Sequence, residues 1–273
     1  LLDDNFVKDI AKQGVVNLLS PKTPSIVDML LGRGTEKVVD SETLAKEIQE
    51  RVSNSLNQKF MYSAVTEESE KFLRTRILQS VEMAVLFIDL VGSTSMILNL
   101  PKEKLATVFT TFAQEMAYII KRHDGFVLKF MGDAVIGYFV SKKSSVSVAS
   151  RAVSCAESML KIIKVGLNPI LKSNGLPELK VRIGIDYGEN VIVRYGDDYD
   201  EAHVDVLGPS VSVAAKILNL AYPDQIMIGN DIYTKIPASI QEYFVYLDLD
   251  SSQWNYKSSK TGNIYPVYAY VGK

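Results

Sequence analysis

Apolar and polar positions divide the chain into two unlike parts. Up to about residue 80, glycine, proline and serine interrupt the apolar residues, and residues 41–60 and 68–80 carry narrow apolar stripes at helical spacing. After residue 80, short apolar runs of strand length alternate with longer segments that are apolar on one helical face. We expect residues 1–80 to form a helical extension or linker and residues 81–273 to form one domain. The extension is either a cap packed on that domain or a connecting helix that relays a signal into it.

The segments after residue 80 follow the order strand, helix, strand, strand, helix, strand. They span residues 81–90, 100–125, 126–130, 134–139, 145–165 and 179–188, with a tight turn at 131–133. This order is that of the split βαβ, ferredoxin-like arrangement, and a right-handed crossover would make the first two strands neighbours. A hairpin, a helix and three strands follow, over residues 190–208, 209–221, 224–229, 242–250 and 265–272. We therefore predict an α+β fold with a ferredoxin-like βαββαβ core, extra C-terminal strands and an N-terminal helical extension.

Charge and cysteine content limit the classes of partner and compartment. The chain has 30 basic and 32 acidic residues and no long basic run, which argues against nucleic acid as a partner. Its one cysteine, Cys155, cannot form an internal disulfide, and no apolar run reaches the roughly 18 residues of a membrane span. We expect a cytoplasmic protein. The sequence begins with Leu, so we expect a fragment or processed chain, and an upstream sensor or membrane domain stays open.

Two aspartates are candidate metal ligands. Asp89 ends the apolar run of the first strand, where a carboxylate is costly unless a charged group lies beside it. Asp133 lies in the hairpin turn between the second and third predicted strands. If the two meet at one sheet edge, they repel each other unless divalent ions lie between them. Oxygen ligands favour Mg²⁺ or Mn²⁺ over zinc, and we interpret His123 and His203 as incidental. The alternative is that Asp89 caps a helix or turn.

The stretch after Asp89 offers backbone groups for an anion. Gly92 begins a Gly-Ser-Thr sequence directly before a predicted helix, and exposed N–H groups at such a place can hold phosphate. This tripeptide is common, so the signal is weak by itself. Together with carboxylates and metal, it indicates nucleoside triphosphate chemistry.

Four ordered motifs resemble a known family. They are FIDLVGST, KFMGDAVIGYF, VRIGIDYG and VDVLGPSVSVAAKI, and their order and spacing resemble the class III nucleotidyl cyclase catalytic domain of adenylate and guanylate cyclases. The resemblance runs from about Val81 to the C-terminus and is greatest to an adenylate cyclase. It implies that Asp89 and Asp133 bind two Mg²⁺ or Mn²⁺ ions per site, with the Leu90 carbonyl as a further ligand. It also implies triphosphate binding by three residues: Gly92, Ser93 and Thr94.

The resemblance further implies a base-reading pair and a homodimer. Lys129 and Asp205 match the family's base-reading positions, and their chemistry suits adenine, because lysine donates to N1 and the carboxylate accepts from the amino group. Guanine reverses this pattern, because it has a donor at N1 and an acceptor at O6. The family assembles head to tail, with each site shared between two subunits and the hairpin over residues 191–204 as the dimer arm.

The sequence departs from the family in one helix. The family has an asparagine that orients the ribose and, four residues on, an arginine that contacts the α-phosphate; here these catalytic positions hold Ser212 and Lys216. Their spacing places both on one helix face, opposite an apolar stripe of Val211, Ala214, Ala215 and Leu218. Lysine keeps the charge of arginine without its bidentate fork. In the polar loop before the last strand, Lys257 and Lys260 could also reach the triphosphate.

These observations support two hypotheses for the function, one an enzyme and the other a binding module. The first is an adenylate cyclase, a phosphorus–oxygen lyase of signal transduction that converts ATP to cyclic AMP and pyrophosphate in a homodimer. The second, motivated by Ser212 and Lys216, is a degenerate cyclase-fold module that binds a nucleotide or a partner. A cyclase acting on another nucleotide is a third possibility. The hairpin motif of diguanylate-type enzymes is absent, since KFMGDAV occupies the turn.

Overall fold

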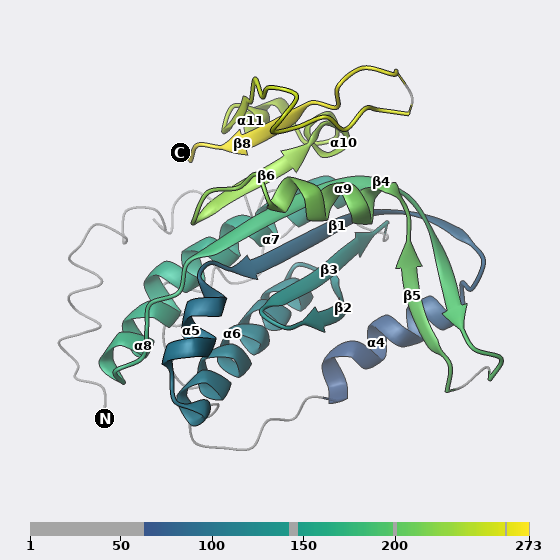
Figure 1. The fold of residues 1–273 in the computed structure, drawn as a ribbon. Coiled ribbons are helices and arrows are strands. Elements are labelled where there is room, and N and C mark those ends of the chain that lie inside the picture. The colour runs from purple at the N-terminus through teal and green to yellow at the C-terminus, as the bar shows by residue number, and fades with distance from the viewer. Residues whose placement is uncertain (1–62, 142–146, 199–200, 260, 273) are drawn as a thin grey trace, which may run out of the picture.

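One eight-stranded sheet organises the domain (Figure 1). A computed structural model describes residues 63–141, 147–198, 201–259 and 261–272. The strands are β1 (Ser80–Leu90), β2 (Phe126–Met131), β3 (Ala134–Val140), β4 (Val181–Tyr195), β5 (His203–Leu207), β6 (Gln225–Gly229), β7 (Phe244–Tyr246) and β8 (Val267–Tyr270). Their order across the sheet is β2-β3-β1-β4-β6-β8-β7, and β5 pairs with β4.

Helices cover both faces of the sheet. They are α4 (Ser63–Arg74), α5 (Ser93–Asn99), α6 (Lys102–Arg122), α7 (Val148–Ile162), α8 (Asn168–Ser173), α9 (Pro209–Leu218), α10 (Asn230–Tyr233) and α11 (Ala238–Gln241), with a π-helical turn at Ile163–Leu167. Helices α6 and α7 pack on one face, while α4 and α9 pack on the other. No helix within the described ranges is both long and apolar enough to cross a bilayer. The predicted helix over residues 41–60 lies outside the described residues.

Strand β1 contributes to two separate cores because its side chains alternate. Leu86 and Ile88 are buried in the core with α6 and α7, whereas Val85 and Phe87 are buried in the core with α4 and α9. Asp89 continues the second series, so it belongs to the face that carries α9. Cys155 is fully buried in α7 within the first core, as a small core residue should be.

The predicted α+β fold with a βαββαβ core is confirmed, but one neighbour relation is wrong. Strands β1 and β2 are not neighbours, because β3 lies between them and β1 pairs with β3 and β4. All seven residues of β3 are buried, whereas β2 is mostly half-buried and carries a lysine. An apolar strand gains most from the interior of a sheet, so β3 takes the central place and β2 the edge.

Two predicted helix boundaries change. The predicted helix over residues 100–125 ends as α6 at Arg122, and Asp124 after it has left-handed backbone. The predicted helix over residues 145–165 ends as α7 at Ile162, where the π-helical turn begins. These are local differences that leave the strand order unchanged.

Helix α4 packs on the domain beside the hairpin of β4 and β5 (Figure 1). Phe72 packs against Phe126 of β2 with ring centroids 5.1 Å apart and the rings tilted by 30°, and the Ser69 hydroxyl lies 3.1 Å from the Tyr138 hydroxyl. Arg74 donates to the carbonyl of Ala202 in the hairpin, at 3.0 Å. The described end of the N-terminal extension is therefore a packed cap. Signal relay through it and the division at residue 80 stay predictions.

Candidate functional site

The structure brings the two predicted carboxylates together at one end of the sheet. Asp89 lies opposite Ala134, so the β2–β3 turn with Asp133 directly adjoins the end of β1. The amide of Leu90 donates to the Asp133 carbonyl at 3.3 Å, and the charge of Asp133 lies near enough to Asp89 to contribute to the raised pKa of Asp89. Although β2 is not next to β1, the turn after β2 delivers Asp133 to the expected place.

Arg182 is a third charged group in this cluster, and the sequence analysis missed it. It lies opposite Asp89 in the antiparallel pairing of β1 with β4, and its Nη2 is 2.6 Å from Asp89 Oδ2. Burial raises the pKa of Asp89, the hydrogen bond from Arg182 opposes that change, and the charge of Asp133 raises the pKa further. The signal in the sequence was a charged residue between the buried Val181 and Ile183 of β4.

The donor chemistry of this cluster fits a hard divalent cation. Two carboxylates held together in a partly buried place disfavour full ionisation, as the raised pKa of Asp89 indicates, and a cation between them removes that repulsion. Within the described ranges, no group of three or more His, Cys, Asp and Glu side chains could hold a metal. Mg²⁺ keeps several waters and substrate phosphates as ligands, so one or two carboxylates are enough to hold it.

The Gly-Ser-Thr stretch lies directly after this cluster. Gly92 has left-handed backbone with φ 76° and precedes the seven-residue helix α5, which begins at Ser93. Gly92 and Thr94 are exposed and Ser93 is half-buried. The stretch is therefore accessible and only three residues beyond Asp89.

The predicted base-reading residues form an ion pair. Lys129 of edge strand β2 places Nζ 2.5 Å from Asp205 Oδ2 of β5, and the other oxygen of Asp205 accepts from the amide of Val206 at 2.9 Å. Asp205 is largely shielded, with 13% of its side chain exposed, while Lys129 is 35% exposed. The expectation that the two act together is compatible with this geometry. The exposed His203 lies 4.0 Å from Asp205, whereas His123 contacts Ser158 on the helical face.

Helix α9 presents Ser212 and Lys216 on one exposed face, as the spacing predicted. Neither side chain makes a hydrogen bond or ion pair with any residue that the structure describes. The buried stripe differs from the prediction. Its apolar members are Val213, Ala214, Ile217 and Leu218, while Val211 and Ala215 are half-buried.

The distance of α9 from the sheet depends on Gly184 of β4. A Cβ at this position would lie 2.5 Å from the Ala214 carbonyl oxygen and 2.6 Å from the Leu218 amide nitrogen. Both are backbone atoms of α9, so any larger residue would push the helix outward. Gly184 therefore fixes how far Ser212 and Lys216 stand above the sheet.

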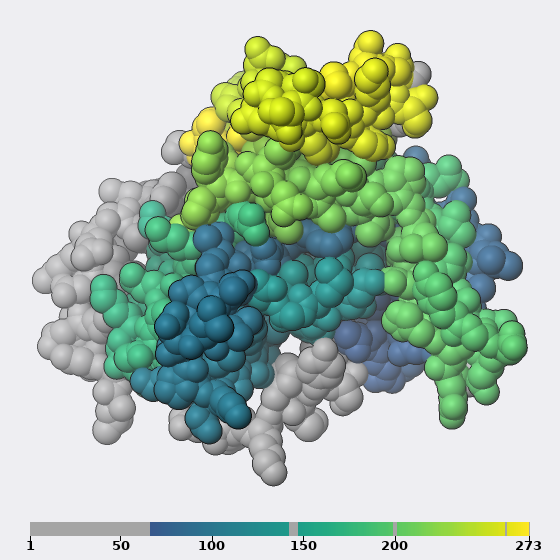
Figure 2. All heavy atoms as spheres, in the orientation of Figure 1, coloured from purple at the N-terminus to yellow at the C-terminus, as the bar shows by residue number. Residues whose placement is uncertain are grey.

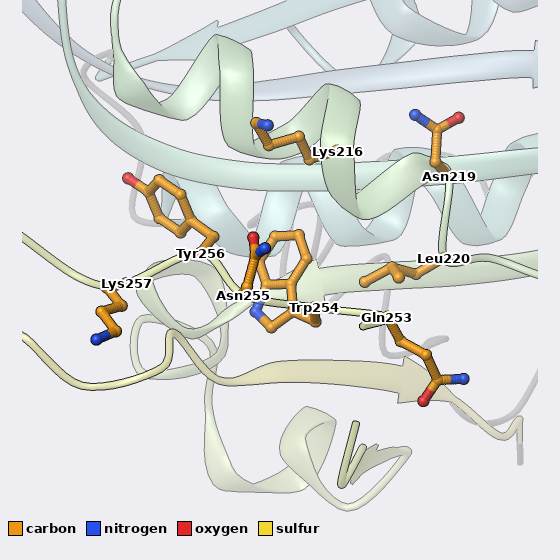
Figure 3. A pocket seen from close by; sticks show the side chains of 8 residues that line it. All are labelled: Lys216, Asn219, Leu220, Gln253, Trp254, Asn255, Tyr256 and Lys257. Atoms are coloured by element: carbon orange, nitrogen blue, oxygen red, sulfur yellow. The ribbon is translucent and has the colours of Figure 1, made fainter. Parts of the chain in front are cut away.

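An open pocket of about 620 Å³ adjoins α9 (Figure 3). Lys216 and Asn219 reach it from the helix side, and Lys257 reaches it from the loop before β8. The structure thus brings two of the predicted lysines to one pocket. The other lining residues, which the sequence analysis did not find, are Leu220, Gln253, Trp254, Asn255 and Tyr256. Lys260 lies outside the described residues.

The two groups of site residues occupy distinct parts of the surface. The space-filling view shows the β4–β5 hairpin projecting from the body on one side and the C-terminal strands covering another (Figure 2). The ion pair of Lys129 and Asp205 joins the hairpin to β2, whereas the pocket with Lys216 and Lys257 lies between α9 and the C-terminal loop.

Known nucleotide cyclases are similar to this chain in sequence. A cytidylate cyclase from Staphylococcus aureus is 31% identical over 157 residues, which cover 56% of this chain and 37% of that protein. A uridylate cyclase from Gulbenkiania mobilis is 27% identical over 205 residues, which cover 69% of this chain and 79% of that protein. The chain thus spans little more than a third of the first relative's length.

Solved structures share the fold. The crystal structure of the adenylyl cyclase CyaB from P. aeruginosa superimposes with a TM-score of 0.59 at 24% identity, covering 71% of this chain and 96% of that one. The sequence pattern of the adenylate and guanylate cyclase catalytic domain matches residues 77–251. This match covers more than half of the chain and includes both carboxylates, the ion pair and helix α9, so the chain belongs to the adenylate and guanylate cyclase catalytic domain family.

Proposed function

We propose that this domain is an adenylate cyclase that converts ATP to 3′,5′-cyclic AMP and pyrophosphate. The observation that carries the choice of nucleotide is the ion pair between Lys129 and Asp205, which places one donor and one acceptor 2.5 Å apart. Adenine presents an acceptor at N1 next to an amino group that donates. A base that enters between the two side chains can satisfy both.

The same pair disfavours guanine and uracil. Both of these bases present an N–H donor beside a carbonyl acceptor, which is the reverse of the adenine pattern. Lys129 would then face a donor and Asp205 an acceptor, and a site that leaves buried polar groups unpaired discriminates strongly. We therefore expect GTP and UTP to be poor substrates.

CTP is the second candidate. Cytosine presents an acceptor at N3 beside an amino group, so its hydrogen-bonding edge matches that of adenine, and only ring size separates the two. The relative from Staphylococcus aureus is named a cytidylate cyclase, which favours this candidate. Another relative is named a uridylate cyclase, but the hydrogen-bonding edge of uracil does not fit the charges of Lys129 and Asp205 in this chain.

For the reacting end, we assign Asp89, Asp133 and the Leu90 carbonyl to two Mg²⁺ or Mn²⁺ ions. When bound, such ions lower the pKa of the attacking hydroxyl and stabilise the leaving pyrophosphate. Arg182 holds the Asp89 carboxylate in place at 2.6 Å and offsets its charge. We assign the backbone of Gly92, Ser93 and Thr94, three to five residues beyond Asp89 at the start of α5, to the phosphate oxygens.

The residues on α9 and in the C-terminal loop act on the substrate's sugar and phosphates. We assign the Ser212 hydroxyl to the ribose and the Lys216 ammonium to the α-phosphate, where negative charge accumulates as the bond forms. Lys257, on the other side of the same pocket, is assigned to the triphosphate. Lys260 remains a predicted triphosphate contact.

A head-to-tail homodimer would complete each site. One chain carries both the carboxylate cluster and the base-reading pair, and Lys216 and Ser212 face outward from α9 with no ionic or hydrogen-bonding partner among the described residues. An exposed reacting group next to an open pocket is the arrangement expected of half a site. A second copy would supply the opposite half, so that two identical chains enclose two substrates.

Product analysis tests this function. The protein is incubated separately with ATP, CTP, GTP and UTP in Mg²⁺ or Mn²⁺, and products are identified by chromatography and mass spectrometry. We expect cyclic AMP, with Asp89→Ala abolishing it and Glu82→Gln, on the same strand, leaving it unchanged. Cyclic CMP as the main product would support the second candidate. ATP binding without any cyclic product would support the degenerate module that Ser212 and Lys216 suggest.

A further inference from the structure

A buried carboxylate outside the assigned site lies under the C-terminal loop. Asp186 of β4 is 3% exposed, and its Oδ1 accepts a hydrogen bond of 2.7 Å from the Tyr265 hydroxyl. Tyr265 itself is 6% exposed. A carboxylate in such a place is unfavourable unless it is held by strong hydrogen bonds, so this contact needs an explanation.

The strand next to Asp186 is shaped to admit this contact. A Cβ on Gly229, the last residue of β6, would lie 2.2 Å from Asp186 Oδ1 and 2.8 Å from a ring carbon of Tyr265. Only glycine therefore leaves room for the carboxylate and the ring together. The hydroxyl of Tyr265 also accepts from the amide of Asp231, at 2.8 Å, so it donates to one partner and accepts from another.

Tyr265 in turn holds the wall of the pocket next to α9. Its carbonyl accepts from the indole N–H of Trp254 at 2.7 Å, and its amide donates to the carbonyl of Tyr256 at 2.9 Å. Trp254 and Tyr256 line the pocket, and Lys257 follows them directly and pairs with Ile264 across the loop. A chain of contacts thus runs from Asp186 through Tyr265 to the backbone of the segment that carries Lys257. Figure 3 shows Trp254, Tyr256 and Lys257 of this segment.

We propose that Asp186 and Tyr265 are positioning residues that hold Lys257 in the pocket for an inorganic or nucleoside triphosphate. This inference rests on the proposed function, which assigns Lys257 to the triphosphate. An exposed lysine on a loop loses much side-chain freedom when it binds, and a fixed backbone limits the further loss. The buried hydrogen bond between Tyr265 and Asp186 fixes the loop backbone without using the Lys257 ammonium, which stays available to the substrate.

The protonation state of Tyr265 agrees with its role as a donor. Burial raises the pKa of Tyr265 well above its usual value, and the neighbouring Asp186 charge raises it further. The hydroxyl therefore keeps its proton over the whole range in which the protein would work.

Binding of tripolyphosphate with Mg²⁺, measured by calorimetry on the full chain, tests the inference without requiring turnover. Tyr265→Phe removes only the hydroxyl, and we expect its affinity for tripolyphosphate to fall about tenfold. Tyr268→Phe, the same substitution three residues further on, is the matched control and should bind normally. The ratio of kcat/KM for ATP over GTP should stay unchanged in Tyr265→Phe, because Lys129 and Asp205 are untouched.

Conservative variants separate positioning from folding. Asp186→Asn keeps an oxygen that accepts from Tyr265 and should retain most of the affinity, whereas Asp186→Ala should lose as much as Tyr265→Phe. An equal loss in both Asp186 variants, in proportion to a drop in melting temperature, would mean that the pair merely stabilises the fold and would overturn the inference.

A double variant decides whether the effect passes through Lys257. In a Lys257→Gln background, Tyr265→Phe should add less than twofold to the loss, because the group that it positions is already gone. A fully additive loss, or normal binding by Tyr265→Phe alone, would overturn the inference and leave the role of Lys257 intact. Normal binding by Lys257→Gln would overturn both the inference and the proposed assignment of Lys257 to the triphosphate.

Discussion

The charged residues of the strands and those around α9 differ in how their charges are balanced. On the strands, Asp89 is paired with Arg182 and Lys129 with Asp205, at 2.6 Å and 2.5 Å. On α9, Lys216 is exposed and has no ionic partner within the described ranges. Register brings Asp89 and Arg182 together, because they lie opposite each other on the paired strands β1 and β4. The ion pair of Lys129 and Asp205 joins β2 to β5, two strands that do not pair with each other.

This contrast assigns different tasks to the two regions. A half-buried ion pair holds its side chains in a fixed geometry, and removing one member leaves the other charge poorly solvated. An exposed lysine is already hydrated and gains an anion without first losing a partner. We therefore propose that the strands define where metals and base bind, and that the α9 pocket provides positive charge for the phosphates of a substrate.

Loss of a carboxylate on the strands should have the largest effect. Asp133→Asn keeps the shape of the turn but removes one of two charges that attract divalent ions, so we expect activity to fall at least about a hundredfold. Initial rates over a range of Mn²⁺ concentration measure this loss, with Glu82→Gln as the control. A rate within threefold of the wild type would contradict the metal assignment of Asp133.

Removing the strand arginine should have the next largest effect. Arg182→Met leaves Asp89 next to Asp133 without its cation, and we expect kcat/KM to fall about thirtyfold, as for a lost hydrogen bond between charged groups. Steady-state kinetics measure the fall, and Arg182→Lys should lose less. Unchanged kcat/KM in Arg182→Met would mean that the pair with Asp89 has no part in the reaction.

On α9, substitution toward the family pattern should raise activity. Ser212→Asn with Lys216→Arg restores a longer amide and a bidentate cation on the exposed face, and we expect turnover to rise about tenfold. Single-turnover rates with ATP measure the change. A clear fall would show that the pocket is built around serine and lysine, and would reverse our interpretation of this departure.

The smallest effect is expected where α4 supports the hairpin. Arg74→Ala removes the hydrogen bond to the Ala202 carbonyl, and we expect a loss of about 1 kcal/mol in the free energy of unfolding. Chemical denaturation measures it. Lys71→Ala is the control, because its pair with Glu67 is exposed and contributes little. Equal stability of Arg74→Ala and wild type would mean that α4 does not support the base-reading hairpin.

The sequence predicted those site residues whose placement follows from local pattern. Asp89 and Asp133 end a strand and occupy a turn, and Ser212 and Lys216 are four apart on a helix, so their positions follow from spacing. The succession of strands and helices along the chain could also be predicted from alternating apolar segments.

Residues whose role depends on distant partners could not be predicted. Arg182 is 93 positions from Asp89, and only the register of β1 against β4 brings them together. The position of β3 rather than β2 next to β1 depends on which of the two strands buries more apolar surface in the assembled sheet. Tyr265 and its partner Asp186 lie in segments 79 positions apart, and the loop that they join has no periodicity to read.

One competition experiment tests the central claim that Lys129 and Asp205 select adenine or cytosine, whose Watson–Crick edge presents a ring-nitrogen acceptor beside an amino donor. Equal concentrations of ATP, CTP, GTP and UTP are given to the protein in one reaction, and the four cyclic products are quantified by mass spectrometry. The account predicts that cyclic AMP, or cyclic CMP, exceeds cyclic GMP and cyclic UMP at least about a hundredfold, and that Lys129→Met removes this preference. Cyclic GMP or cyclic UMP as the main product would contradict it.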